Sequence, residues 1–170
     1  LFVVALCVIY QLQDWKKVLI LVTAFTIGHS ITLALSTLNL VNFRSDIIEF
    51  LIPVTIFVTA FGNLLRKQSA LTPSKFNTNY FFALFFGLIH GLGFSNYLKS
   101  LLGKEDSIVT PLLAFNVGLE LGQIIIVLFF MVIAFVFVSL FNVSRRDWTL
   151  IISSAVAGIA ITMMIETRFW

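Results

Sequence analysis

Charged residues and cysteine are scarce in this sequence, and each shortage excludes a class of protein. Asp, Glu, Lys and Arg make up 11% of the 170 residues, whereas they account for about a quarter of an average soluble domain. The chain therefore cannot be a water-soluble globular domain. Its single cysteine, Cys7, lies within an apolar run. One cysteine can form neither an internal disulfide framework nor a thiolate metal cluster, so a disulfide-stabilised domain is excluded as well.

Apolar residues are abundant and occur in long runs. They make up 59% of the chain, and the mean hydropathy is +1.04. Several runs of roughly 20 residues lack Lys, Arg and Asp, and about 20 apolar residues in a helix span the hydrocarbon core of a bilayer. No tract shows the strict alternation of short segments that a membrane β-barrel needs. The sequence thus predicts an all-α fold, a polytopic transmembrane helical bundle that forms a single domain over residues 1–170.

Six apolar segments, separated by short loops, define the expected spans. They cover residues 1–13, 16–38, 46–66, 79–102, 108–141 and 147–166. The first run reaches only to about Leu12 and would be roughly 18 Å long as a helix, so we expect it to be the end of a truncated first helix. The fifth segment is too long for one perpendicular span. We expect it to tilt, to protrude or to begin at the interface near Pro111.

Basic residues are distributed unequally between the two ends of these segments. One side holds seven, namely Lys16, Lys17, Arg66, Lys67, Lys75, Arg145 and Arg146. The other side holds four, namely Arg44, Lys99, Lys104 and Arg168. Because loops rich in Lys and Arg stay in the cytoplasm, loops one, three and five are predicted to be cytoplasmic and the C-terminus to lie outside. The net charge of +3 then reflects topology, and no nucleic-acid partner is expected.

Three ionisable residues lie deep inside apolar segments. His29, His90 and Glu120 occur in the second, fourth and fifth segments. Helical rise places each of them roughly 15 to 20 Å from the end of its segment, near the middle of a hydrocarbon core about 30 Å thick. Burying such groups costs free energy unless they pair, line a cavity or bind a ligand. We therefore expect the two imidazoles and the carboxylate to converge.

Amide side chains accompany the carboxylate. Asn116, Glu120 and Gln123 stand at positions i, i+4 and i+7 and share one helical face. With the two histidines they offer nitrogen and oxygen ligands, which suit a divalent transition metal such as Ni²⁺, Co²⁺, Zn²⁺, Cu²⁺ or Fe²⁺. The candidate metal site therefore comprises His29, His90, Glu120, Asn116 and Gln123. Either histidine taken alone is equally well explained as a hydrogen-bonded contact between helices.

Other polar and small residues also suggest roles inside the bundle. Asn63, with Thr59 and Thr55 one and two turns earlier, forms a stripe on the third segment. The stripe predicts hydrogen bonds between helices, and alternatively it lines the inner half of a path through the bundle. Gly91 and Gly93 lie in the middle of the fourth segment. They predict a break in that helix of the kind that transporters use at midplane sites.

Three runs of sequence carry a family resemblance. They are residues 25–33 (FTIGHSITL), 86–94 (FGLIHGLGF) and 113–123 (LAFNVGLELGQ). With these runs in order, and with Glu49 and Asn63 where the family tends to carry an acid and an amide, the chain resembles the HupE/UreJ family of bacterial membrane proteins over nearly its whole length. The resemblance implies a multi-pass protein of the bacterial inner membrane that takes up nickel or cobalt. It also implies binding or conducting roles for His29, His90, Asn116, Glu120 and Gln123.

One motif of that family has no counterpart in the chain. The family carries a His and an Asp-His pair in its first helix, and these would lie before Leu1. The metal site read from the present residues is therefore expected to be incomplete.

Three functions are compatible with these residues. The first is a secondary permease for a divalent transition metal, driven by a gradient or by another subunit because no Walker-type glycine loop is present. The second is an intramembrane metalloenzyme in which Glu120 acts as a general base. The third is a non-catalytic scaffold in which His29, His90 and Glu120 only join helices. We favour the permease over an enzyme, with the lipid bilayer and the metal ion as partners and a homo-oligomer left open.

Overall fold

The computed structural model describes residues 1–66, 78–102 and 109–170. In chain order its elements are α1 (Phe2–Cys7), η1 (Leu12–Asp14), α2 (Trp15–Thr37), α3 (Ser45–Leu65), α4 (Thr78–Leu102), α5 (Val109–Phe135), η3 (Val136–Leu140) and α6 (Arg145–Glu166). Of these, η1 is a 3-10 turn and η3 is a π-helical turn that follows α5 directly. Among the basic residues used to predict topology, Lys67, Lys75 and Lys104 lie outside the described residues. The predicted all-α bundle is confirmed.

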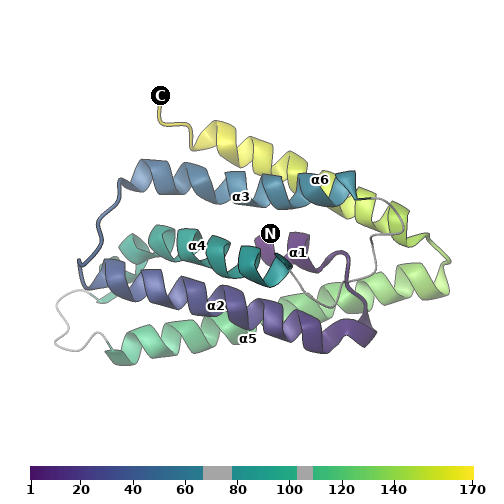
Figure 1. The fold of residues 1–170 in the computed structure, drawn as a ribbon, viewed down its shortest axis with the longest axis horizontal. Helices are drawn as coiled ribbons and strands as arrows, with labels where there is room; N and C mark the ends of the chain where they lie inside the picture. The colour runs from purple at the N-terminus through teal and green to yellow at the C-terminus, as the bar shows by residue number, and fades with distance from the viewer. Residues whose placement is uncertain (67–77, 103–108) are drawn as a thin grey trace.

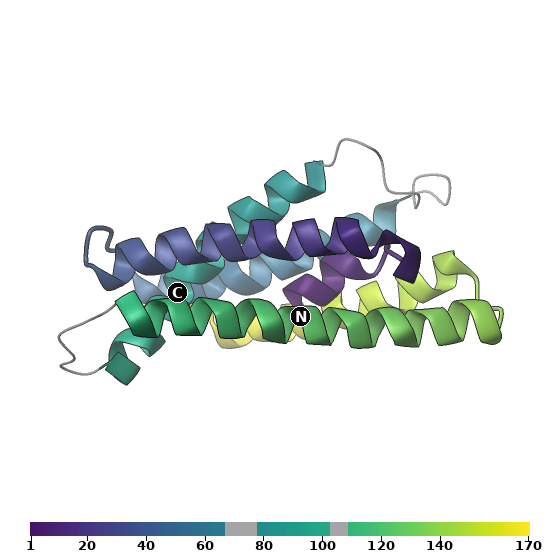
Figure 2. The same ribbon diagram turned by 90° about the horizontal axis from the view of Figure 1, so that it is seen from below.

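The long helices run side by side along the longest dimension of the molecule (Figure 1). α2 packs most extensively on α4, and α3 packs most extensively on α6. α5 lies along α2, as the view from below also shows (Figure 2). The short helix α1 is enclosed by the bundle, and each of its six residues is buried. α2 and α4, with the two histidines, therefore form the middle of the molecule.

Five helical stretches in the described part of the chain are long and apolar enough to cross a membrane. They are Leu12–Thr37, Ser45–Leu65, Asn79–Ser100, Val109–Leu140 and Arg145–Glu166. The fifth segment is longer than one perpendicular span requires, as expected, because α5 and η3 together form a stretch of 32 residues. With six residues, α1 is too short to cross. The chain is a multi-pass membrane protein.

Glycines bring the backbones of α2 and α4 into direct contact. A Cβ atom on Gly87 would overlap the carbonyl oxygen of Phe25, at less than the 3.0 Å that real Cβ atoms respect. Gly91, four residues later, lies in the same way against the carbonyl oxygen of His29, and Gly28 of α2 lies against a carbonyl oxygen of α4. Small residues at this spacing are typical of closely packed transmembrane helices. These glycines therefore determine how closely α2 and α4, with the polar side chains that they carry, can approach each other.

The predicted break in the fourth helix is wrong. α4 runs as a continuous helix from Thr78 to Leu102, through both Gly91 and Gly93. A Cβ atom on Gly93 would meet the side chain of Ile52 in α3, just as one on Gly91 would meet the backbone of α2. Both glycines thus permit close packing against neighbouring helices, and the helix continues through them.

One end of the bundle, here called the basic end, collects the start of α2, the end of α3 and the start of α6 (Figure 1). Its described basic residues are Lys16, Lys17, Arg66, Arg145 and Arg146. Arg146 donates to the backbone carbonyl oxygens of Leu64, at 3.1 Å, and of Arg66. It thereby satisfies carbonyl groups that the end of α3 leaves without helical partners. The grouping agrees with the predicted loop arrangement, while the cytoplasmic assignment of this end stays a prediction.

Candidate functional site

His29 lies buried in the centre of the bundle with no polar contact to its ring. Its exposed fraction is 1%, and neither Nδ1 nor Nε2 has a hydrogen-bond partner among the described residues. The rings of Phe25, Phe94 and Phe115 surround it, with centroid separations of 6.1, 5.5 and 6.3 Å. Buried polar groups in proteins are nearly always hydrogen-bonded. This imidazole is therefore available to bind a water molecule or an ion.

His90 lies beside the same phenylalanine ring and has one defined partner. Its ring centroid is 5.3 Å from that of Phe25 and 5.2 Å from that of Phe2. Its Nε2 atom is 3.0 Å from Oγ1 of Thr55, which itself donates to the carbonyl oxygen of Ile52 at 2.7 Å. Which of the two atoms in this contact donates depends on the tautomer of the ring. The contact joins the ring of His90 in α4 to α3.

α5 turns part of its polar face toward α2. Oγ1 of Thr23 donates to Oε1 of Glu120 at 2.8 Å, and Oγ1 of Thr26 donates to Oε1 of Gln123 at 3.3 Å. Asn116 donates to the carbonyl oxygen one turn earlier in α5, at 2.9 Å. Its Oδ1 atom is buried and has no hydrogen-bond partner among the described residues. Glu120 and Gln123 thus contact α2 together, as their spacing along the helix leads one to expect.

The depth of Glu120 differs from the depth estimated from the sequence. Glu120 bonds to Thr23, six residues before His29, which corresponds to about 9 Å along the helix axis. At the level of His29, α5 presents Phe115 instead. The estimate counted residues from opposite membrane surfaces, with His29 and His90 counted from the cytoplasmic side and Glu120 from the outer side. Counting residues does not determine which turns of α2 and α5 face one another, because that is set by the packing of the two helices.

The five candidate ligands are consequently spread along the interior rather than gathered at one point. Within residues 1–66, 78–102 and 109–170, no three His, Cys, Asp or Glu side chains are close enough together to hold a metal ion. His29 and His90 are brought together around Phe25, whereas Glu120 and Gln123 contact earlier turns of α2. The arrangement is a row of polar groups on the inner side of α2, and metal binding by it stays a prediction.

A cavity of about 230 Å³ lies between α1, α3 and α4 on the side of the basic end. Its polar lining consists of Thr59, Asn63, Arg66 and Asn79. Asn63 donates to the carbonyl oxygen of Ala5 at 2.7 Å, near the end of α1, so the stripe on α3 forms one of the contacts between helices that its pattern predicts. Thr59, by contrast, donates to a carbonyl oxygen of its own helix. Its lining includes Arg66 at the basic end and Phe86, which stands one turn before His90 in α4.

Sequence reasoning missed the aromatic surroundings of the two histidines. Phe25 stands four residues before His29, and Phe94 stands four residues after His90. Residues four apart share a helix face, so the sequence could have placed one phenylalanine on the same face as each histidine. The position of Phe2 against His90 depends on how α1 docks into the bundle, and no local pattern encodes it.

Comparison with known proteins identifies a family. The family model described as HupE / UreJ protein matches residues 1–168, essentially the whole chain. No curated protein and no solved structure matches the chain. The family match agrees with the resemblance carried by residues 25–33, 86–94 and 113–123, and with the multi-pass helical fold. The chain belongs to the HupE / UreJ family.

Proposed function

We propose that the protein is a membrane permease whose cargo is a divalent transition metal ion, with nickel and cobalt as the first candidates. The observation that carries the proposal is the environment of His29, which is 1% exposed and whose two ring nitrogens have no hydrogen-bond partner in the part of the chain that the structure describes. An unsatisfied buried polar group costs about 1–3 kcal/mol. Other buried side chains of the described residues, such as Ser153, also lack a partner, but His29 is set apart by its chemistry, because a neutral imidazole is the commonest metal ligand in proteins.

The row of polar groups suits a cargo that passes through. Conduction requires binding that is favourable enough to admit the ion and weak enough to release it. Glu120 with Thr23, Gln123 with Thr26, and then the two histidines offer carboxylate, amide and imidazole ligands at successive depths. An ion exchanging from one group to the next would never be held by a complete, tight ligand set. The absence of a three-ligand cluster in the described residues is compatible with such a path.

The cavity at the basic end supplies an approach to these groups. Phe86 lines the cavity and its ring lies 5.4 Å from that of Phe2. Phe2 in turn lies 5.2 Å from the ring of His90. Two aromatic rings thus separate the cavity from the nearer histidine. In the proposed path they have to move aside for an ion to pass, which makes them the barrier on this side.

Metal accumulation in cells tests the proposal. Cells that produce the full-length protein should accumulate nickel or cobalt, measured by elemental analysis, and both His29→Ala and His90→Ala should reduce accumulation to the level of cells without the protein. Ser153→Ala serves as the matched control. Ser153 lies in α6, is 0% exposed and has a hydroxyl group without a hydrogen-bond partner among the described residues, so its replacement also removes an unpartnered polar group from the interior, away from the proposed path. Unchanged accumulation in both histidine variants, with normal protein levels, would refute the permease.

A scaffold is the second candidate, and a specific observation favours it. Glu120, Gln123 and His90 each form a hydrogen bond to a threonine on another helix, and such bonds hold transmembrane helices together. If holding helices together is their whole role, Glu120→Ala and His90→Ala lower the melting temperature while accumulation stays at the wild-type level. A permease predicts loss of accumulation at a temperature where the variants remain folded.

A further inference from the structure

Two closely packed helix pairs make up most of the bundle, and a seam between α3 and α4 separates them. α3 and α6 form a layer of their own beside α2 and α4 (Figure 1). Gly28, Gly87 and Gly91 hold α2 and α4 together backbone to backbone. Arg146 of α6 binds the carbonyl oxygens at the end of α3. α3 and α4 contact each other much less than either contacts its own partner, so each pair can move as a unit along the seam.

α3 and α4 meet beside His90, and they meet through side chains. Ile52 of α3 lies so close to Gly93 of α4 that a Cβ atom on this glycine would be less than 3.0 Å from Cδ1 of the isoleucine. About one turn further along α3, Oγ1 of Thr55 lies 3.0 Å from Nε2 of His90. Side chains can change rotamer, whereas the backbones of α2 and α4 cannot give way to each other. The seam can therefore open while both pairs stay intact.

The space along the seam differs greatly between the two sides of these contacts. On the side of the basic end lies the cavity of about 230 Å³, whose lining runs from Phe86 to Arg66. On the opposite side, here called the far end, a pocket lined by Ser36, Glu49 and Gly93 has a volume of about 10 Å³. The far-end pocket is at the lower limit for one water molecule, and the cavity has room for several.

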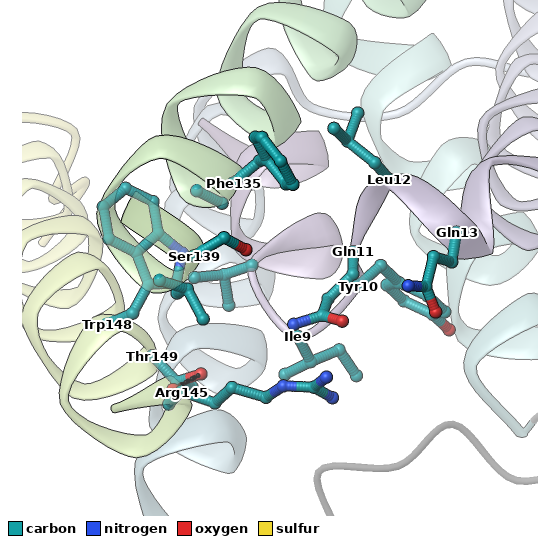
Figure 3. A pocket seen from close by; sticks show the side chains of 13 residues that line it. Ile9, Tyr10, Gln11, Leu12, Gln13, Phe135, Ser139, Arg145, Trp148 and Thr149 are labelled. Carbon is teal, nitrogen blue, oxygen red and sulfur yellow. Dashed lines mark hydrogen bonds between the residues drawn. The ribbon is translucent and has the colours of Figure 1, made fainter. Parts of the chain in front are cut away.

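The other border of the α3–α6 pair is hollow at the basic end as well. A pocket of about 100 Å³ lies between the start of α6 and the turn that joins α1 to η1. Figure 3 shows Trp148 and Arg145 of α6 on one side of it, with Leu12 and Gln13 across from them. The α3–α6 pair is thus bordered by open space on two sides at the basic end, while the seam is closed at the far end. This is the form expected when one pair is tilted away from the other at the basic end.

We propose that the α3–α6 pair moves against the α2–α4 pair, so that His90 is accessible from the basic end and from the far end in turn. This inference rests on the proposed permease, since transporters commonly work by such alternating access. The structure then has the conformation that is open on the side of the basic end, and the contact of Ile52 with Gly93 is the closed gate on the far side. When this gate opens, the far-end pocket joins the surroundings of His90, and Glu49 in its lining offers a carboxylate to an incoming cation.

Exchanging the sizes of the two gate residues tests the proposal. In Gly93→Val, the larger side chain overlaps Ile52 in the closed gate, so the open gate should be favoured. In the double variant Ile52→Ala, Gly93→Val, the carbon atoms added on one side are removed from the other, so closure should return. Ser36→Cys, made in a Cys7→Ala background, reports on the gate. Ser36 lines the far-end pocket from α2 and is 6% exposed.

The measurement is the rate at which Ser36→Cys reacts with a small membrane-impermeant thiol reagent in sealed vesicles, without any metal. Lys16→Cys and Arg44→Cys, at exposed positions of the two ends, show which side the reagent reaches. We expect slow reaction with the gate residues unchanged, about tenfold faster reaction from the Arg44 side in Gly93→Val, and slow reaction again in the double variant. Gly158→Val is the matched control, because a Cβ atom there would meet nothing within 4 Å and the rate should not change.

Equal rates with and without Gly93→Val overturn the gate. A faster rate that persists in the double variant overturns it too, because general loosening of the bundle, and not the fit of two side chains, would then be the cause. The absence of metal separates this result from the permease. Uptake of nickel or cobalt by wild-type vesicles, with unchanged rates in Gly93→Val, would refute the moving seam alone. The expected rates without any uptake would support the moving seam and refute the permease.

Discussion

Replacing Gly87 by alanine tests the close packing of α2 on α4 that positions both histidines. The added Cβ would lie less than 3.0 Å from the carbonyl oxygen of Phe25 and 3.1 Å from the backbone nitrogen of His29. Backbone atoms cannot swing aside as the end of a flexible side chain can. The two helices therefore have to move apart toward the 3.4 Å at which ordinary contact begins, and the row of polar groups between α2, α4 and α5 moves with them.

The expected loss of stability follows from two opposing effects. Forcing an extra carbon into a well-packed interior costs about 1–3 kcal/mol, and rigid backbone on the facing side places Gly87 in the upper part of that range. Alanine in place of glycine stabilises a helix by up to about 1 kcal/mol. The net loss is about 1–2 kcal/mol, which lowers the melting temperature of a chain of this size by roughly 2–8 °C.

Gly158→Ala provides the matched control for this substitution. Gly158 lies within α6, and a Cβ atom there would meet nothing within 4 Å. Only the gain in helix propensity applies, so the melting temperature should stay the same or rise. The assay is thermal unfolding of the purified protein in detergent, followed by tryptophan fluorescence. If Gly87→Ala melts at or above the temperature of Gly158→Ala, α2 and α4 do not pack through these glycines.

Three further substitutions test individual contacts by the same melting assay. Thr55→Val leaves Nε2 of His90 buried without its hydrogen-bond partner and should cost about 1–3 kcal/mol; a wild-type melting temperature would contradict a hydrogen bond between the two residues. Asn63→Leu deprives the carbonyl oxygen of Ala5 of its donor, with a loss of similar size, and a neutral result would mean that α1 docks differently. Asp46→Asn breaks a salt bridge of 2.6 Å whose acidic partner is 38% exposed. It should leave the melting temperature close to the wild-type value, since exposed pairs contribute little, and a clear decrease would indicate a second role for that carboxylate.

The fold was predictable from the sequence because each of its determinants is local. Runs such as residues 46–66 and 147–166 contain enough apolar residues to cross a bilayer, and the corresponding helices, Ser45–Leu65 and Arg145–Glu166, begin and end within two residues of the predicted limits. The loops begin where the sequence changes to polar residues. At Asn39 and Asn142 the chain takes up a positive φ, 57° and 54°, which asparagine tolerates better than most residues.

The candidate site was predictable only in part, because its geometry depends on how helices shift along one another. The spacing of Glu120 and Gln123 correctly places them on one face, toward α2. Their depth relative to His29 could not be obtained from counting residues, since the packing of the two helices decides which turn of α2 each residue of α5 contacts. The pattern of Gly91 and Gly93 fits a helix break and a packing surface equally well, and only the contact with α2 and α3 distinguishes the two.

Metal uptake by the purified full-length protein in sealed vesicles tests the central claim most directly. With a metal-sensitive fluorescent chelator enclosed, vesicles that contain the wild-type protein should show a saturable signal after addition of nickel or cobalt. His29→Ala should remove that signal because it removes the unpartnered imidazole from the interior, whereas Ser153→Ala should retain it. Identical signals from wild-type, His29→Ala and protein-free vesicles would contradict the claim that a transition metal crosses the membrane through this bundle.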